Sequence, residues 1–308
     1  NQIKSAKESA IIGSGHLIAM TAASKSISAS GKLKEIWSGI ESLTTVKNTL
    51  ANSREDNFCE LCIKLKSIHT KFMSQARQIL LVCEQRDMIE FTDNIKNHAL
   101  SGHQFDPSSG KIELDLESSH KSSCYTTNTQ VNFCARSYET VSSGHPDAPI
   151  LSVLGGILRN GYLHQAIREI GGAYGGGASQ DSDSGAFRFF SYRDPRLSET
   201  LDDFDKAIAW IKSKPATEQM IEEAILGVVS SLDKPKSPSG EAKEAFFLEL
   251  NGRNETTVNE FRNRVLKVCS KDIDRVANKY LTSENCHTAI ITNELKTNEL
   301  DFDHVEAI

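Results

Sequence analysis

The segment LRNGYLHQAIREIGGAYGGGASQDSDSGAFRFFSYR, residues 158–193, carries the densest structural signal in this chain of 308 residues. A helical pattern over 162–170 ends at Gly171 and the glycine after it, the residue type most common just past a helix C-terminus. Two strand patterns follow at 173–179 and 186–193, and the residues between them are typical of a hairpin connection. The segment therefore predicts a helix that turns at a glycine corner into two antiparallel strands.

Outward from this segment, alternating apolar and polar residues predict a half-buried strand at 129–138, and the apolar run 287–292 predicts a closing strand. A helix is predicted to begin after His145 and to be interrupted at Asn160 and Gly161. This order predicts an α+β fold with helices layered on an antiparallel sheet. Further helices are expected at 198–212, 217–232, 242–250, 258–268 and 270–280.

The first hundred residues are mainly helical in pattern. The apolar run 78–84 is bounded by polar residues and predicts a buried strand. The Ser-, Gly- and Asp-rich stretch 101–123 is the best linker candidate. We therefore predict two layered helix-on-antiparallel-sheet domains, with the first truncated and ending with its linker at 1–117, and the second at 118–308. Helices are expected at 4–28, 33–43, 56–75 and 88–100.

The composition bounds the function classes. The formal net charge of −6 argues against binding to nucleic acid or to an anionic membrane surface. No apolar run reaches the roughly 18 residues that a membrane span needs. The seven cysteines are odd in number and scattered, which indicates reduced thiols in the cytoplasm or an organelle matrix. The chain starts without a methionine, so we expect it to belong to a longer protein.

Two side chains at the glycine corner are candidates for chemistry. Arg168 lies in the last turn of a predicted helix, and Tyr174 follows it by six residues at the start of a strand. A cation and a phenol that converge on one point can stabilise an oxyanion or hold a peptide carbonyl. Gly175 and Gly176 leave the strand beside Tyr174 without side chains, so a ligand can approach the backbone. The structural alternative stays open, because the helix dipole alone favours Arg168 and a tyrosine in a strand is ordinary.

The weaker signals favour structural interpretations. Cys59 and Cys62 lie on a predicted amphipathic helix, and no second pair at zinc-finger spacing accompanies them, so we expect both in a core. His164 shares a helix face with Arg168, but a surface or packed histidine is expected. Asp181 and Asp183 predict a solvated turn, since a calcium loop needs more ligands. The nine histidines never form the His-x-x-Glu-His pattern of a zinc peptidase helix, and no metal site is predicted in this chain.

The most specific stretches of the chain resemble a known family. LRNGYLHQAIREIGGAYGGGA at 158–178, with DSGAFRFFSYRDPR at 183–196, resembles the fourth domain of presequence proteases, which belong to the pitrilysin/insulinase superfamily. GSGHLIAMTAASKSISASGKLKEIWSGI at 13–40 resembles the third domain of the same enzymes. The resemblance implies a clamshell of two halves, each with two α+β domains of the pitrilysin/processing-peptidase type. Its amino-terminal half would hold zinc on a His-x-x-Glu-His helix.

The resemblance also implies roles for the corner. The positions that match Arg168 and Tyr174 contact the substrate near the scissile bond in the family. Arg168 is thus expected to donate to a substrate carbonyl and Tyr174 to the developing oxyanion, with Gly175 and Gly176 beside the peptide.

Two functions follow as hypotheses. In the first, the chain is the non-zinc carboxy-terminal part of a metalloendopeptidase, inactive alone, whose partners are a peptide substrate and the amino-terminal zinc-binding half or a neighbouring domain. In the second, the chain is a non-catalytic peptide-binding or scaffolding subunit of the same superfamily. A partial domain exposes apolar surface, so association with another domain or chain is expected in either case.

Overall fold

The computed structural model of the chain describes residues 2–52, 55–74, 78–98, 114, 116 and 120–308. They belong to two compact units that do not follow chain order. The first combines 1–48, 114–233 and 259–308, and the second combines 49–113 and 234–258. The domain boundary between residues 117 and 118 stays a prediction, but in space the first helices of the chain belong with the sheet that follows them.

The first unit is built on one six-stranded sheet with the order β3-β4-β2-β5-β1-β6. The neighbours from β3 to β5 pair antiparallel, as predicted, whereas β1 runs parallel to both β5 and β6. The expectation of a purely antiparallel sheet is therefore wrong. Its cause is that β1 overlaps the predicted linker and β6 is too short to give a pattern. The strands are β1 (Ser122–Thr126), β2 (Phe133–Glu139), β3 (Gly175–Asp181), β4 (Ala186–Tyr192), β5 (Cys286–Thr292) and β6 (His304–Ala307).

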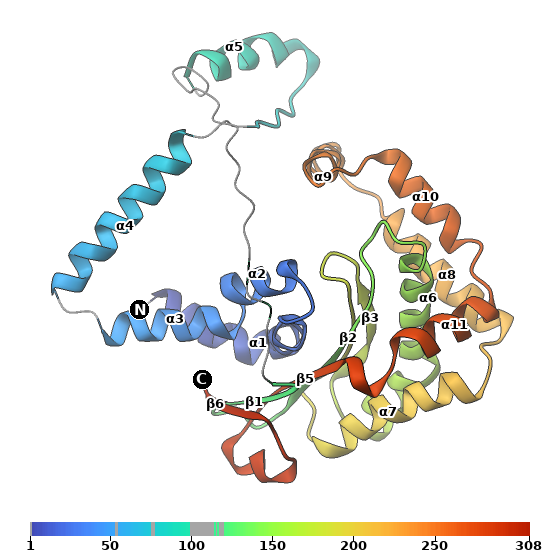
Figure 1. The fold of residues 1–308 in the computed structure, drawn as a ribbon. Coiled ribbons are helices and arrows are strands. Elements are labelled where there is room, and N and C mark those ends of the chain that lie inside the picture. The colour runs from blue at the N-terminus through green and yellow to red at the C-terminus, as the bar shows by residue number, and fades with distance from the viewer. Residues whose placement is uncertain (1, 53–54, 75–77, 99–113, 115, 117–119) are drawn as a thin grey trace. The chain divides into compact units, whose positions relative to one another are not determined.

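Helices cover both faces of this sheet, which confirms the predicted α+β class (Figure 1). On one face α1 (Gln2–Ser24) packs on β2, β4 and β5, and its core includes Tyr125, Phe133 and Ile291. The other face buries Leu154, Phe187 and Phe189 beneath the remaining helices of the unit. Those helices are α6 (Ala148–Leu158), η2 (Arg159–Ile170), α7 (Ser198–Ser213), α8 (Glu218–Leu232), α10 (Glu255–Val265) and α11 (Ser270–Tyr280). Shorter pieces are α2 (Ala29–Ser38), α3 (Ile40–Ala51), η3 (Ser283–Asn285) and η4 (Glu294–Glu299).

The helix that leads to the glycine corner is continuous. α6 passes directly into η2, which is wound as a π-helix, so the predicted interruption at Asn160 and Gly161 is wrong. A Cβ on Gly161 would lie 2.6 Å from the Trp210 ring and 2.8 Å from the Met220 methyl group. The glycine therefore serves close packing of α7 and α8 against the helix, and does not break it.

The second unit contains α4 (Glu55–Ser74), η1 (Gln85–Asp87), α5 (Met88–His98) and α9 (Pro238–Leu250). The helix predictions are confirmed here, but the strand predicted at 78–84 is wrong, because no described strand lies beside it to complete a hydrogen-bonded ladder. Cys59 and Cys62 are exposed on α4, which contradicts the core prediction for this pair. No helix among the described residues has the length and apolar character that membrane crossing requires.

The N-terminus of α6 is fixed by a buried carboxylate. Asp147 accepts hydrogen bonds from Arg275 Nη2 at 2.7 Å, from Tyr280 Oη at 2.7 Å and from Lys279 Nζ at 3.3 Å, all on α11. The hydrogen bond from Arg275, followed by that from Tyr280, holds the pKa of Asp147 well below its usual range. α11 is thereby tied to the start of the helix that carries the corner.

Asp147→Asn is expected to lower the free energy of unfolding near neutral pH by about 1–3 kcal/mol, because hydrogen bonds to a charged group are lost. The folded pKa lies below the unfolded value of about 3.9, so this stabilisation is present above about pH 4 and is lost as the pH falls further. Urea unfolding at a series of pH values measures it, with Asp202→Asn on the exposed side of α7 as control. A difference between wild type and Asp147→Asn that does not shrink in acid would contradict the assignment.

Candidate functional site

η2 ends at a tight corner that leads into β3. Gly171 N–H donates to Ala166 O at 3.0 Å, a bond across five residues, and Ala173 N–H donates to Ile167 O at 3.1 Å. Gly172 has a φ of 78°, in the left-handed region that favours glycine. These bonds let the chain leave the helix and enter the strand within a few residues.

Arg168 and Tyr174 flank this corner, and both are solvent-exposed. Arg168 lies in the last turn of η2, while Tyr174 is 72% exposed and directly precedes β3. The Arg168 guanidinium makes no hydrogen bond or ion pair to another described residue. Both side chains are accessible to a ligand, and their convergence on one point stays a prediction.

The Tyr174 side of the corner is anchored to β4 and α1. Tyr174 N–H donates to Arg193 O at 3.4 Å, and its ring meets the Tyr192 ring edge-on with centroids 5.5 Å apart. Tyr192 Oη in turn donates to Gly13 O of α1 at 3.1 Å. Arg193 has a φ of 50°, a conformation that non-glycine residues seldom adopt. The sequence pattern does not single out Tyr192, which is indistinguishable from any aromatic residue of a strand.

The glycines of β3 have different surroundings. A Cβ on Gly176 would lie 2.7 Å from the Ile167 side chain, and one on Gly177 would lie 3.0 Å from the Arg159 stem. Packing against η2 therefore accounts for both of these glycines. No heavy atom lies within 4 Å of a Cβ built on Gly175, so the space beside this residue is open. Substrate contact at Gly175 and Gly176 remains a prediction, and only at Gly175 does packing leave the missing side chain unexplained.

The other candidates from the sequence have structural partners. His164 is exposed and its Nδ1 lies 3.2 Å from Glu169 Oε1. Asp181 is held by Arg188 at 3.0 Å and by Lys34 at 3.1 Å. In the part of the chain that the structure describes, no group of three or more His, Cys, Asp or Glu side chains is arranged to hold a metal ion. The chemistry this corner can offer is hydrogen-bond donation from a cation and a phenol.

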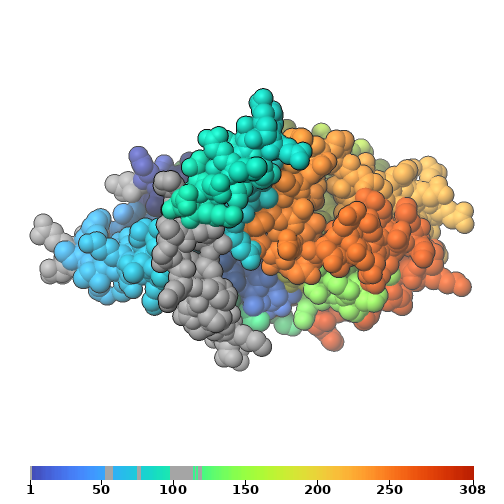
Figure 2. Space-filling view, turned by 90° about the horizontal axis from the view of Figure 1, so that it is seen from above, coloured from blue at the N-terminus to red at the C-terminus, as the bar shows by residue number. Residues whose placement is uncertain are grey.

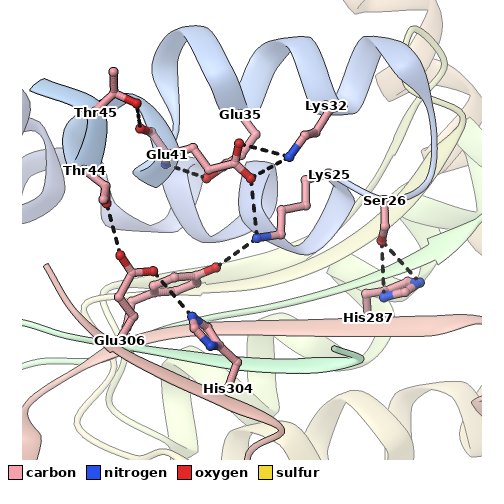
Figure 3. Close-up of polar contacts among 11 residues, drawn as sticks. Lys25, Ser26, Lys32, Glu35, Glu41, Thr44, Thr45, His287, His304 and Glu306 are labelled. Carbon is pink, nitrogen blue, oxygen red and sulfur yellow. Dashed lines mark hydrogen bonds and ion pairs between the residues drawn. The ribbon is translucent and has the colours of Figure 1, made fainter. Parts of the chain in front are cut away.

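A second polar cluster joins α2 and α3 to the sheet (Figure 3). Glu35 is fully buried, and its Oε1 accepts the Glu41 N–H at the start of α3 at 3.1 Å. Burial raises the pKa of Glu35. Lys25 links Glu41, at 3.7 Å, to the hydroxyl of the buried Tyr125, at 3.4 Å. The contacts run among the protein's own groups, so we assign this cluster to packing of the helices on the sheet.

Known proteins share both the sequence and the fold. The family model described as PreP C-terminal domain matches residues 123–293, and a second model, for the region associated with subfamily C of the M16 peptidases, matches residues 1–48. The chain belongs to the PreP C-terminal domain family. It is 31% identical over 286 residues to a mitochondrial presequence protease of Drosophila melanogaster, covering 90% of the chain, and 32% identical over 293 residues to that of Emericella nidulans, covering 93%. It spans only 26% and 28% of the lengths of these two relatives.

Solved structures agree on the fold. A conserved protein from Enterococcus faecalis V583 matches 95% of this chain and 67% of its own, with a TM-score of 0.63 and 14% identity. A peptidase M16 inactive domain from Pseudomonas fluorescens matches 67% of this chain and 51% of its own, with a TM-score of 0.51 and 15% identity. At these identities the likeness concerns architecture alone.

The two glycines at the start of β3 offer a matched test. Gly176→Ala is expected to lower the free energy of unfolding by about 1–3 kcal/mol, because the added methyl group overlaps Ile167. Gly175→Ala should change it by less than about 0.5 kcal/mol, since its surroundings are open. Urea unfolding of both variants measures the contrast, and equal losses would contradict the packing assignment.

Proposed function

We propose that this chain supplies the non-zinc, substrate-contacting part of a zinc metalloendopeptidase that degrades peptides in a closed chamber within the mitochondrion. The observation that carries the proposal is the accessible Arg168–Tyr174 corner inside the segment that matches the PreP C-terminal family. The name of the relatives, presequence protease, mitochondrial, supports the substrate class and the compartment.

The corner residues have distinct roles in this proposal. The Arg168 guanidinium donates charge-assisted hydrogen bonds to a carbonyl of the bound peptide and holds it in place. The Tyr174 phenol donates to the oxyanion that develops as the peptide carbonyl is attacked. The zinc ion, held by the remainder of the longer parent protein, would supply the activated water. This chain alone is therefore expected to be inactive.

The partner that carries zinc needs a docking surface, and α4 offers one. Its apolar residues recur at heptad spacing and form a stripe that the second unit leaves uncovered. Phe58, Leu65, Ile68 and Phe72 are 56%, 55%, 62% and 76% exposed. The light-blue atoms of α4 are in view in Figure 2. Since most of each relative's length lies outside this chain, we propose that the amino-terminal zinc-binding part covers the stripe.

Assembly of the chain with the zinc-bearing part of its parent protein is expected to give cleavage of a quenched fluorescent peptide. Arg168→Ala and Tyr174→Phe should each lower kcat/KM by about 100-fold, the usual effect of removing one donor to an oxyanion. Arg264→Ala, an exposed arginine on α10, is the matched control and should retain full activity. Full activity in both corner variants would refute the proposed chemistry and favour the scaffolding alternative.

The docking surface is tested separately by binding. Leu65→Gln together with Phe72→Gln should weaken association with the zinc-bearing part by about tenfold or more, because buried apolar area is replaced by polar groups. Ser67→Gln, on the opposite side of α4, is the control and should bind as wild type. Calorimetric titration gives both affinities, and equal values for the double variant and wild type would exclude α4 as the interface.

A further inference from the structure

We propose that Arg196 is a positioning residue, which fixes Arg168 and Tyr174 relative to each other at the corner. Its catalytic consequence rests on the proposed function, whereas its mechanical effect does not. The sequence analysis gives Arg196 no role beyond the resemblance, because the helix it contacts lies 30 residues earlier in the chain.

Arg196 lies directly on the last turn of η2. Its Nη2 donates to Ala166 O at 3.2 Å, the same carbonyl that accepts the Gly171 N–H at 3.0 Å. A Cβ built on Gly171 would lie 1.9 Å from Nη2, so the guanidinium fills the space that a side chain would take. The turn that carries Arg168 is thereby closed by Arg196.

The guanidinium is itself held from α7. Arg196 Nη1 lies 3.1 Å from the nearly buried Asp203 carboxylate. The Arg196 backbone N–H donates to Asp194 Oδ1 at 3.0 Å, and Asp194 Oδ2 accepts the Thr200 hydroxyl at 2.7 Å. These contacts place the arginine before it meets η2, so the hydrogen bond to Ala166 O costs little side-chain entropy.

The loop that carries Arg196 is tied to the middle of the sheet. Asn132, which is buried, donates from Nδ2 to Asp194 O at 3.1 Å and to Arg196 O at 2.9 Å. Its Oδ1 accepts the Thr292 hydroxyl of β5 at 2.6 Å. The loop therefore cannot shift without breaking contacts to two strands.

One short segment thus holds both sides of the corner. Arg193 O accepts the Tyr174 N–H, and three residues later the Arg196 guanidinium closes the turn of Arg168. A lysine cannot replace this arrangement, because a single ammonium group lacks the planar fork that serves a carbonyl and a carboxylate together. Arg196 acts through these two groups and needs no contact with substrate.

The mechanical effect is tested on the chain alone by amide hydrogen exchange. Arg196→Met should speed exchange at Gly171 and Ala173 by about tenfold or more, as expected for loss of one charge-assisted hydrogen bond. Exchange in β5 should stay unchanged, and Arg196→Lys should give an intermediate rate. Arg262→Met removes an exposed ion pair to Asp233, away from the corner, and serves as control. Unchanged exchange at the corner in Arg196→Met would overturn the inference whatever the activity of the protein.

The catalytic effect is tested in the assembled peptidase by a double-mutant cycle. Arg196→Met should lower kcat by about tenfold with little change in KM, yet have almost no further effect in the Arg168→Ala/Tyr174→Phe background. Losses that multiply independently would overturn the positioning role. If Arg168→Ala/Tyr174→Phe leaves cleavage unchanged while Arg196→Met still speeds exchange, the proposed function fails together with the catalytic role, and the mechanical hold stands.

Discussion

The close approach of the α6–η2 helix to the edge strand β3 is the constraint on which the site depends. A Cβ on Gly155 of α6 would lie 3.2 Å from the Ala178 carbonyl oxygen, and Gly176 and Gly177 accept the Ile167 and Arg159 side chains in the same way. Because the helix lies so near the strand, its C-terminus ends beside the residue that begins β3. Packing and presentation of Arg168 and Tyr174 are thus one requirement, and side chains at these glycines would disturb both.

Much of this fold can be predicted from residue spacing. The strands β2 to β5 and most helices bury one face, so their apolar residues recur with the period of the element. The failures have local causes: Gly161 resembles a helix breaker but is a packing glycine, and 78–84 is apolar without a strand beside it. For the site, the glycine corner and the resemblance pointed to Arg168 and Tyr174. Contacts between distant parts of the chain, such as Arg196 with Ala166, leave no periodic trace and could not be predicted.

The two matched segments of the chain form one structural body in the described residues. The helix α1 belongs to the segment matched at 1–48, yet it buries Phe133 and Ile291 of the sheet that the other match provides. Tyr192 adds a hydrogen bond from β4 to Gly13. The ring against which Tyr174 rests is therefore fixed by residues nearly 180 positions earlier. Family boundaries drawn along the sequence do not coincide with the packing that supports the corner.

The π winding of η2 sets a narrow tolerance for changes in length. Its buried residues, Leu163 and Ile167, follow Leu158 of α6 by steps of five and then four, wider than an ordinary α-helix would give. Deleting one residue in this helix would restore tighter coiling and keep an apolar stripe inward. It would also rotate Arg168 by about 100° around the helix axis and aim its guanidinium elsewhere. Homologues with a shorter segment here would share the architecture but present a different side chain at the corner.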